Sequence, residues 1–295
     1  MKKLMLSLFI AFGFSACSLN NDDLKVDCGA SQDKTFTGFP LLCSYSVNTL
    51  PTNPAAVLVG SDEKMKSLFT KHENSCPNST DTPIDFSKDI LVGIFAGLKT
   101  TNGYSIKITT IEENKCEILI NYYEKAPQAG ETIVSAPSYP SDFILIPRTS
   151  KAILFNKVSE TTVNINNNIV IGSFNKQCTT ADCQKFFQIN DFNILKFQNV
   201  VAGGYDFNQY RYTATTQKGD YTLFLKNVPT EILNLKGQTK TYGTPDAVDH
   251  GGVYFELRQG ITVTKVFIDN TDTADQSTEV KIFKKAIQDK ITSLK

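Results

Sequence analysis

The chain has no tryptophan, only two histidines and no excess of either charge. Thirty basic residues balance thirty acidic ones, which argues against nucleic acid as a partner because phosphate binding needs a basic excess or a basic face. Beyond the first seventeen residues no apolar stretch is long enough to span a bilayer, which takes about 20 residues. No G-x-S-x-G, H-E-x-x-H or Walker motif occurs, so motifs reveal no catalytic machinery.

The composition is that of a folded protein rather than a disordered one. Hydrophobic residues make up 41% of the chain and charged residues 20%, which is enough apolar material for a packed core. Without the first seventeen residues, 295 − 17 = 278 residues remain. That length suits one large domain or two domains of ordinary size.

The first seventeen residues have the anatomy of a secretory signal peptide, with a basic start, a short apolar run and small residues before a cysteine. Phe14-Ser15-Ala16-Cys17 resembles the bacterial lipobox. The resemblance implies that residues 1–16 are removed and that the Cys17 thiol is acylated, with palmitate as an expected acyl group. We therefore expect a lipid-anchored cell-envelope protein with a polar tether at residues 17–27. Ser18, in place of Asp, points to the outer membrane, and its periplasmic and surface faces remain open alternatives.

Six cysteines remain once Cys17 is set aside. An even number in an exported chain predicts disulfides, although six cysteines allow fifteen connectivities. Pairing sequence neighbours is the simplest assignment, whereas the C-x4-C spacing of the last two residues is a poor match to a zinc site. The predicted pairs are Cys28–Cys43, Cys76–Cys116 and Cys178–Cys183.

Hydrophobic patterns predict a mainly β, α+β fold with two β-rich domains, residues 28–160 and 165–295, each carrying one packed helix. The boundary falls in the polar stretch at residues 159–168. In the first domain a helix is expected over residues 62–73, with His72 on its apolar stripe, followed by several strands.

In the second domain, strands are expected at, among others, residues 193–200, 209–216 and 221–228. The C-terminal helix, capped by Asp275, has an apolar stripe at intervals of three and four residues, which is typical of a helix packed on a sheet. Its lysines are assigned to a solvated face: Lys281, Lys284, Lys285 and Lys290.

Residues 86–158 resemble the C-terminal domain of the PrcB family, whose founding member is tied to a surface protease complex. The resemblance rests first on an apolar strand at residues 90–96 and on a Thr-Asn-Gly-Tyr turn that is similar to the family's T-G-G-Y mark. It also rests on the P-x-x-G turn of Pro127 and Gly130 and on the Ile-Pro-Arg strand end at residues 146–148. Asn102 replaces the first glycine of that mark, and asparagine tolerates positive φ. The family implies a small non-enzymatic lipoprotein module tied to a protease complex.

Thr101, Asn102, Gly103 and Tyr104 form the most distinctive turn of this segment. They constitute either a rigid recognition turn or simply the turn that the fold requires, and the second interpretation is favoured because Asn-Gly is a common turn pair.

Asp246, Asp249 and His250 are the best candidates for a metal-binding or catalytic cluster, since a carboxylate near an imidazole can orient it or share a cation. Their Pro-Asp and Gly-Gly surroundings favour turn stabilisation instead. Residues 269–275 resemble a calcium loop only distantly, because the central glycine and the terminal glutamate are absent. We therefore assign neither metal nor cofactor.

The sequence predicts a non-enzymatic protein-binding module that stabilises or inhibits an envelope protein, with a protease as the foremost candidate. One alternative is a metal-binding or hydrolytic domain around Asp246, Asp249 and His250. Another is a structural or ligand-binding envelope component, which an apolar pocket between the two domains would favour.

Overall fold

The computed structural model describes residues 27–79, 83–127, 130–158, 167–175, 177, 184–245, 247 and 250–294. The predicted signal peptide, Cys17 and most of the tether lie outside these residues, as do Cys178, Cys183 and most of the predicted domain boundary. No helix in the described ranges has the length and apolar character required to cross a membrane.

Most of the regular structure is β, which confirms the predicted fold class. An eleven-stranded sheet runs through the molecule in the order β15-β17-β16-β11-β12-β13-β14-β2-β9-β6-β4, beside a four-stranded sheet, β1-β7-β8-β10, and the pair β3-β5. The elements of the first half are β1 (Gln32–Lys34), β2 (Phe36–Gly38), β3 (Tyr45–Val47), β4 (Ala55–Val59), α1 (Asp62–Leu68), β5 (Phe69–Lys71), β6 (Asp89–Phe95), β7 (Ser105–Glu113), β8 (Glu117–Lys125), β9 (Ser141–Pro147) and β10 (Ala152–Lys157). Those of the second half are β11 (Asn168–Phe174), β12 (Lys185–Ile189), β13 (Ile194–Phe197), β14 (Tyr212–Ala214), α2 (Tyr221–Leu225), α3 (Thr230–Leu233), β15 (Thr239–Tyr242), β16 (Gly252–Gln259), β17 (Thr262–Asp269) and α4 (Thr278–Ser293).

The short strand β2 joins the two halves of the chain into one sheet. Thr37 is paired with Thr213 of β14 on one side and with Leu145 of β9 on the other. The neighbouring Gly38 lies under the Tyr212 ring, where a Cβ atom would approach ring carbons to 2.1 Å. Glycine is therefore required at this crossing, and the two predicted domains share a continuous β-sheet.

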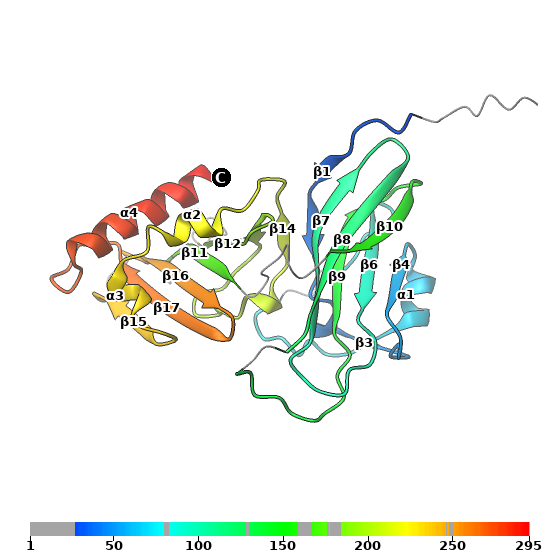
Figure 1. Cartoon of the computed structure of the whole chain (residues 1–295), viewed down its shortest axis with the longest axis horizontal. Helices are drawn as coiled ribbons and strands as arrows, with labels where there is room; N and C mark the ends of the chain where they lie inside the picture. The colour runs from blue at the N-terminus through cyan, green and yellow to red at the C-terminus, as the bar shows by residue number, and fades with distance from the viewer. Residues whose placement is uncertain are drawn as a thin grey trace, which may run out of the picture.

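The long sheet is covered differently on its two faces. On one face, α2, α3 and α4 bury the apolar residues of the second half, and α1 covers those of the first half. On the other face lie the four-stranded sheet, packed on the first half, and the aromatic loop at residues 200–210, packed on the second half. Figure 1 shows the two halves side by side, with α4 and α1 far apart.

Several predicted elements differ from the observed ones. Residues 221–225, predicted as part of a strand, form α2, whose Tyr221 and Phe224 face the helix-covered core. Helix α1 ends at Leu68 because the chain turns into β5, so His72 lies beyond the helix and is exposed. Ser277, rather than Asp275, caps α4 by accepting a hydrogen bond from the Val280 amide.

The disulfides Cys28–Cys116 and Cys43–Cys76 replace the predicted pairs Cys28–Cys43 and Cys76–Cys116. Strand β1 pairs with β7, which brings Cys28 to the β7–β8 turn, where its carbonyl accepts the Lys115 amide. Pairing of β3 with β5 brings Cys43 beside Cys76. Neighbour pairing failed because long-range strand pairing, rather than sequence distance, sets which thiols meet. Cys178–Cys183 stays a prediction.

Non-reducing peptide mapping should recover Cys28 linked to Cys116 and Cys43 linked to Cys76. Replacing both Cys43 and Cys76 by serine should lower the free energy of unfolding by about 2–4 kcal/mol, because the open chain gains conformational entropy. Urea denaturation of the oxidised protein measures this loss. Peptides linking Cys28 to Cys43 would contradict the described pairing.

Candidate functional site

The Thr101–Tyr104 turn lies in the loop before β7 and is held by a second loop, at residues 131–138. The Asn102 side chain accepts a hydrogen bond from the Val134 amide at 2.7 Å, and the Asn102 amide donates to the Val134 carbonyl at 3.2 Å. The Ser138 hydroxyl donates to the Thr101 carbonyl at 2.8 Å. These contacts join the two loops into a single surface.

Gly103 is the position of the turn that requires glycine. Its φ is +87°, and a Cβ atom there would lie 3.0 Å from the Pro127 ring. Asn102, the residue that departs from the family's T-G-G-Y mark, does not adopt positive φ. Its contribution is instead the side-chain oxygen, which holds the loop at residues 131–138 in place. The nearby Tyr104 ring lies 5.3 Å from the Lys99 ammonium group.

We call the surface formed by Leu98, Thr101–Tyr104, Ile133 and Val134 the turn platform. Its three aliphatic side chains are exposed, at 41% for Leu98, 53% for Ile133 and 51% for Val134. Large aliphatic side chains exposed on loops that hydrogen-bond to each other are typical of a surface that contacts another protein.

Ion pairs behind the turn platform fix its base. Glu124 on β8 is bonded to Lys99 at 2.5 Å and to Lys157 at 2.7 Å. Burial alone would raise the pKa of Glu124, but the hydrogen bonds from Lys157 and Lys99 outweigh it and lower the pKa. Lys125 and Glu131 form a second, well-buried pair. The platform is therefore supported by charged groups that are already neutralised within the protein.

The predicted Asp246, Asp249 and His250 cluster is described only in part, because both aspartates lie outside the described residues. His250 is exposed; its carbonyl accepts the Asn270 side-chain amide at 2.6 Å and its Nδ1 lies 3.3 Å from the Thr271 hydroxyl. Across the described ranges no three histidine, cysteine, aspartate or glutamate residues are grouped to hold a metal ion.

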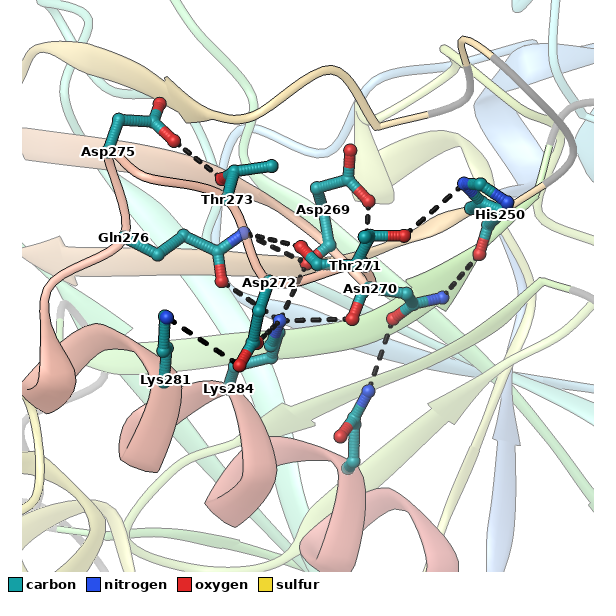
Figure 2. A network of polar contacts seen from close by, with 11 residues as sticks. His250, Asp269, Asn270, Thr271, Asp272, Thr273, Asp275, Gln276, Lys281 and Lys284 are labelled. Carbon is teal, nitrogen blue, oxygen red and sulfur yellow. Dashed lines mark hydrogen bonds and ion pairs between the residues drawn. The ribbon is translucent and has the colours of Figure 1, made fainter.

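The distant calcium-loop resemblance at residues 269–275 has a structural explanation: the loop surrounds an ammonium group. Lys284, predicted to be solvent-facing, is only 5% exposed. As Figure 2 shows, its Nζ reaches the Asp269 and Asn270 carbonyls, both at 3.0 Å, Asp272 at 2.8 Å and the Gln276 side-chain oxygen at 2.9 Å. Four oxygen atoms thus surround the cation that α4 itself supplies.

Neighbouring side chains complete this cage, which we call the Lys284 cage. Gln276 also donates to the Thr271 carbonyl at 2.9 Å, and the Asp269 carboxylate accepts the Thr271 and Thr244 amides. Asp275 accepts the Gly243 amide at 2.9 Å. The network ties the loop that follows β17 to α4 and to the end of β15, which makes it a stabilising device rather than a reaction centre.

Residues 90–147 match the PrcB C-terminal family. The matched segment comprises nearly all of β6 together with β7, β8, β9 and the loops that form the turn platform. The first half therefore contains a PrcB C-terminal-like domain, which confirms the resemblance seen in the sequence. No curated protein and no solved structure matches the chain.

Lys284→Met should lower the free energy of unfolding by about 1–3 kcal/mol, because it leaves buried oxygen atoms without a donor. Lys281→Met is the matched control. Its ammonium group lies 3.6 Å from the same Asp272 carboxylate but is more exposed, so its loss should be below about 1 kcal/mol. Urea denaturation at neutral pH compares the two, and equal losses would contradict the cage.

The stabilities of the same two variants should also depend differently on pH. The hydrogen bond from Lys284 lowers the pKa of Asp272 below its ordinary value. A carboxyl group with a lowered folded-state pKa adds stability above its unfolded pKa and loses it as the pH falls through the folded value. Below about pH 4, Lys284→Met should therefore lose less stability on acidification than the wild type or Lys281→Met.

Proposed function

We propose that this protein is a lipid-anchored envelope protein that binds another envelope protein without chemical reaction, and that the partner belongs to a protease complex. The observation that carries the proposal is the match of residues 90–147 to the PrcB C-terminal family. The family is associated with a protease complex, and a non-enzymatic module of such a complex would act by binding another protein.

The turn platform is the surface that we propose for docking. It lies within the family match, and its exposed aliphatic side chains are supplied by two loops that hydrogen-bond to each other. Preorganised loops lose little conformational entropy on binding, so their apolar contacts contribute more to affinity. A partner with a complementary apolar patch would bury Leu98, Ile133 and Val134.

The lipobox-like sequence ending at Cys17 supports the proposed anchor, with the outer membrane as the proposed location. Confinement to one membrane raises the effective concentration of the module toward neighbouring proteins. A weak docking surface can then suffice, which fits a small platform.

Affinity purification from envelopes in mild detergent tests the docking proposal. The wild-type protein should recover components of a protease complex, and Ile133→Asp with Val134→Asp should reduce recovery about tenfold, because burying two carboxylates in an apolar contact is unfavourable.

Ile282→Asp is the matched control, since Ile282 is 66% exposed on α4 and lies outside the family match. Its recovery of the partner should equal that of the wild type. Undiminished recovery by the platform variant, or equal loss in the control, would contradict docking at this surface.

Cys17→Ala should abolish incorporation of a clickable palmitate analogue and release the protein from the membrane fraction, since the thiol is the proposed attachment point. Cys178→Ala combined with Cys183→Ala is a suitable control, because both residues lie far from the lipobox in the sequence and the double variant leaves neither member of the predicted pair unpaired. A Cys17→Ala protein that still carried the label would overturn the proposed anchor.

A further inference from the structure

A cleft of about 540 Å³ lies where the two halves of the molecule meet. Its floor is the face of the long sheet opposite the helices, formed by β11, β12, β13, β16 and β17. One wall is β7, which contributes Ser105, Lys107 and Thr109, and the other is the aromatic loop, which contributes residues 205–208 and Tyr210. This volume falls within the range of small-molecule sites.

The floor is unusually polar for a sheet surface between two covering layers. A cross-strand row runs Lys265, Glu256, Val170 and Gln188, each residue opposite the next. The buried Glu256 carboxylate accepts the Tyr254 hydroxyl at 2.7 Å and lies 3.3 Å from the Arg258 guanidinium group. Burial, and then the nearby Glu256, raises the pKa of Tyr254, so the phenol stays a proton donor.

Two amides on this floor have no hydrogen-bond partner among the residues that the structure describes. Asn168 is only 7% exposed, and its side-chain amide makes no hydrogen bond to the described residues. The Gln188 amide, on the next strand, has none with them either. Both residues line the cleft, and neither is among the side chains whose polar atoms are fully buried without a partner. Both amides are therefore accessible from the cleft and positioned to hydrogen-bond to whatever occupies it.

The aromatic wall lies directly beside these amides. The Tyr205 and Tyr254 ring centroids are 4.9 Å apart, and those of Phe207 and Phe197 are 4.7 Å apart. Tyr205 remains half-exposed. An occupant would therefore meet the Tyr205 ring on one side and amide groups below.

The charges that line the cleft cancel. Three cationic residues (Lys107, Arg258 and Lys265) face three acidic ones (Asp142, Asp206 and Glu256). Asp142 is bonded to Lys107 at 3.0 Å, and Asp206 accepts the Gln209 amide at 2.9 Å. Because the charges are largely matched inside the protein, a charged ligand gains little and would disturb existing pairs.

We propose that this cleft binds a neutral oligosaccharide of two or three sugar units. An amide both donates and accepts hydrogen bonds, as does a sugar hydroxyl, and aromatic faces suit the apolar faces of sugar rings. An extended peptide fits less well, because main-chain recognition uses a free strand edge, whereas this floor is a sheet face whose backbone groups are paired with neighbouring strands.

The test uses the full-length purified protein without a protein partner, so its failure leaves the docking proposal untouched. Saturation-transfer NMR and calorimetry are run with maltotriose, cellotriose, xylotriose and triacetylchitotriose at up to about 10 mM, which reveals affinities in the millimolar range. Trigalacturonic acid and trialanine serve as acidic and peptide comparators. At least one neutral trisaccharide should bind, in preference to both comparators.

Asn168→Ala and Gln188→Ala should each weaken that binding about 2- to 10-fold, the value of one neutral hydrogen bond. Gln288→Ala, an amide on α4 that bonds to Asn270, is the matched control and should bind as the wild type does. Asn208→Ala, on the exposed part of the aromatic wall, keeps the test informative if a floor variant fails to fold.

Three results would overturn the proposal. If none of the neutral trisaccharides binds, neutral oligosaccharides are excluded as the ligand class. Tighter binding of trialanine or trigalacturonic acid assigns the cleft to another class. Trisaccharide binding that survives all folded cleft variants places the saccharide elsewhere on the protein.

Discussion

The pairing of β2 with two partners is the constraint on which the rest of the structure depends. Phe36–Gly38 pair with β14 on one edge, and Thr37 and Gly38 pair with β9 on the other, so the sheets of the two halves become one. Phe36 also packs edge-to-face on Tyr212, 6.4 Å between centroids. Because the sheet is continuous, backbone hydrogen bonds between strands set the orientation of the two halves.

This continuity explains how the surfaces arise. The four-stranded sheet and the aromatic loop cover the same face of the long sheet without meeting, and the cleft is the space left between them. Asn193, in the turn before β13, joins the second half to β7 by donating to the Thr109 carbonyl at 2.7 Å. The turn platform, built from the loops of the family-matched segment, is a separate surface with apolar rather than amide character.

The β-rich class, the C-terminal helix and the PrcB-like segment could be predicted because each rests on local periodicity or local motifs. Long-range features could not. Residues 221–228 have a strand-like composition, yet the chain forms α2 where it packs against α4. Lys284 sits four residues after Val280, on the apolar stripe itself. That spacing was a visible signal of burial, but the oxygen atoms that satisfy the ammonium group come from a loop whose path no pattern revealed.

The two disulfides also influence the order in which β2 and its partner strands fold. Cys28 and Cys43 lie on either side of β2 in the sequence, and both form disulfides within the first half. The β14 partner of Thr37 comes 213 − 37 = 176 residues later, a separation that makes strand pairing slow. Oxidation can thus hold β2 in place as a template before the second half arrives, so the rate of assembly should depend on how quickly these two disulfides form.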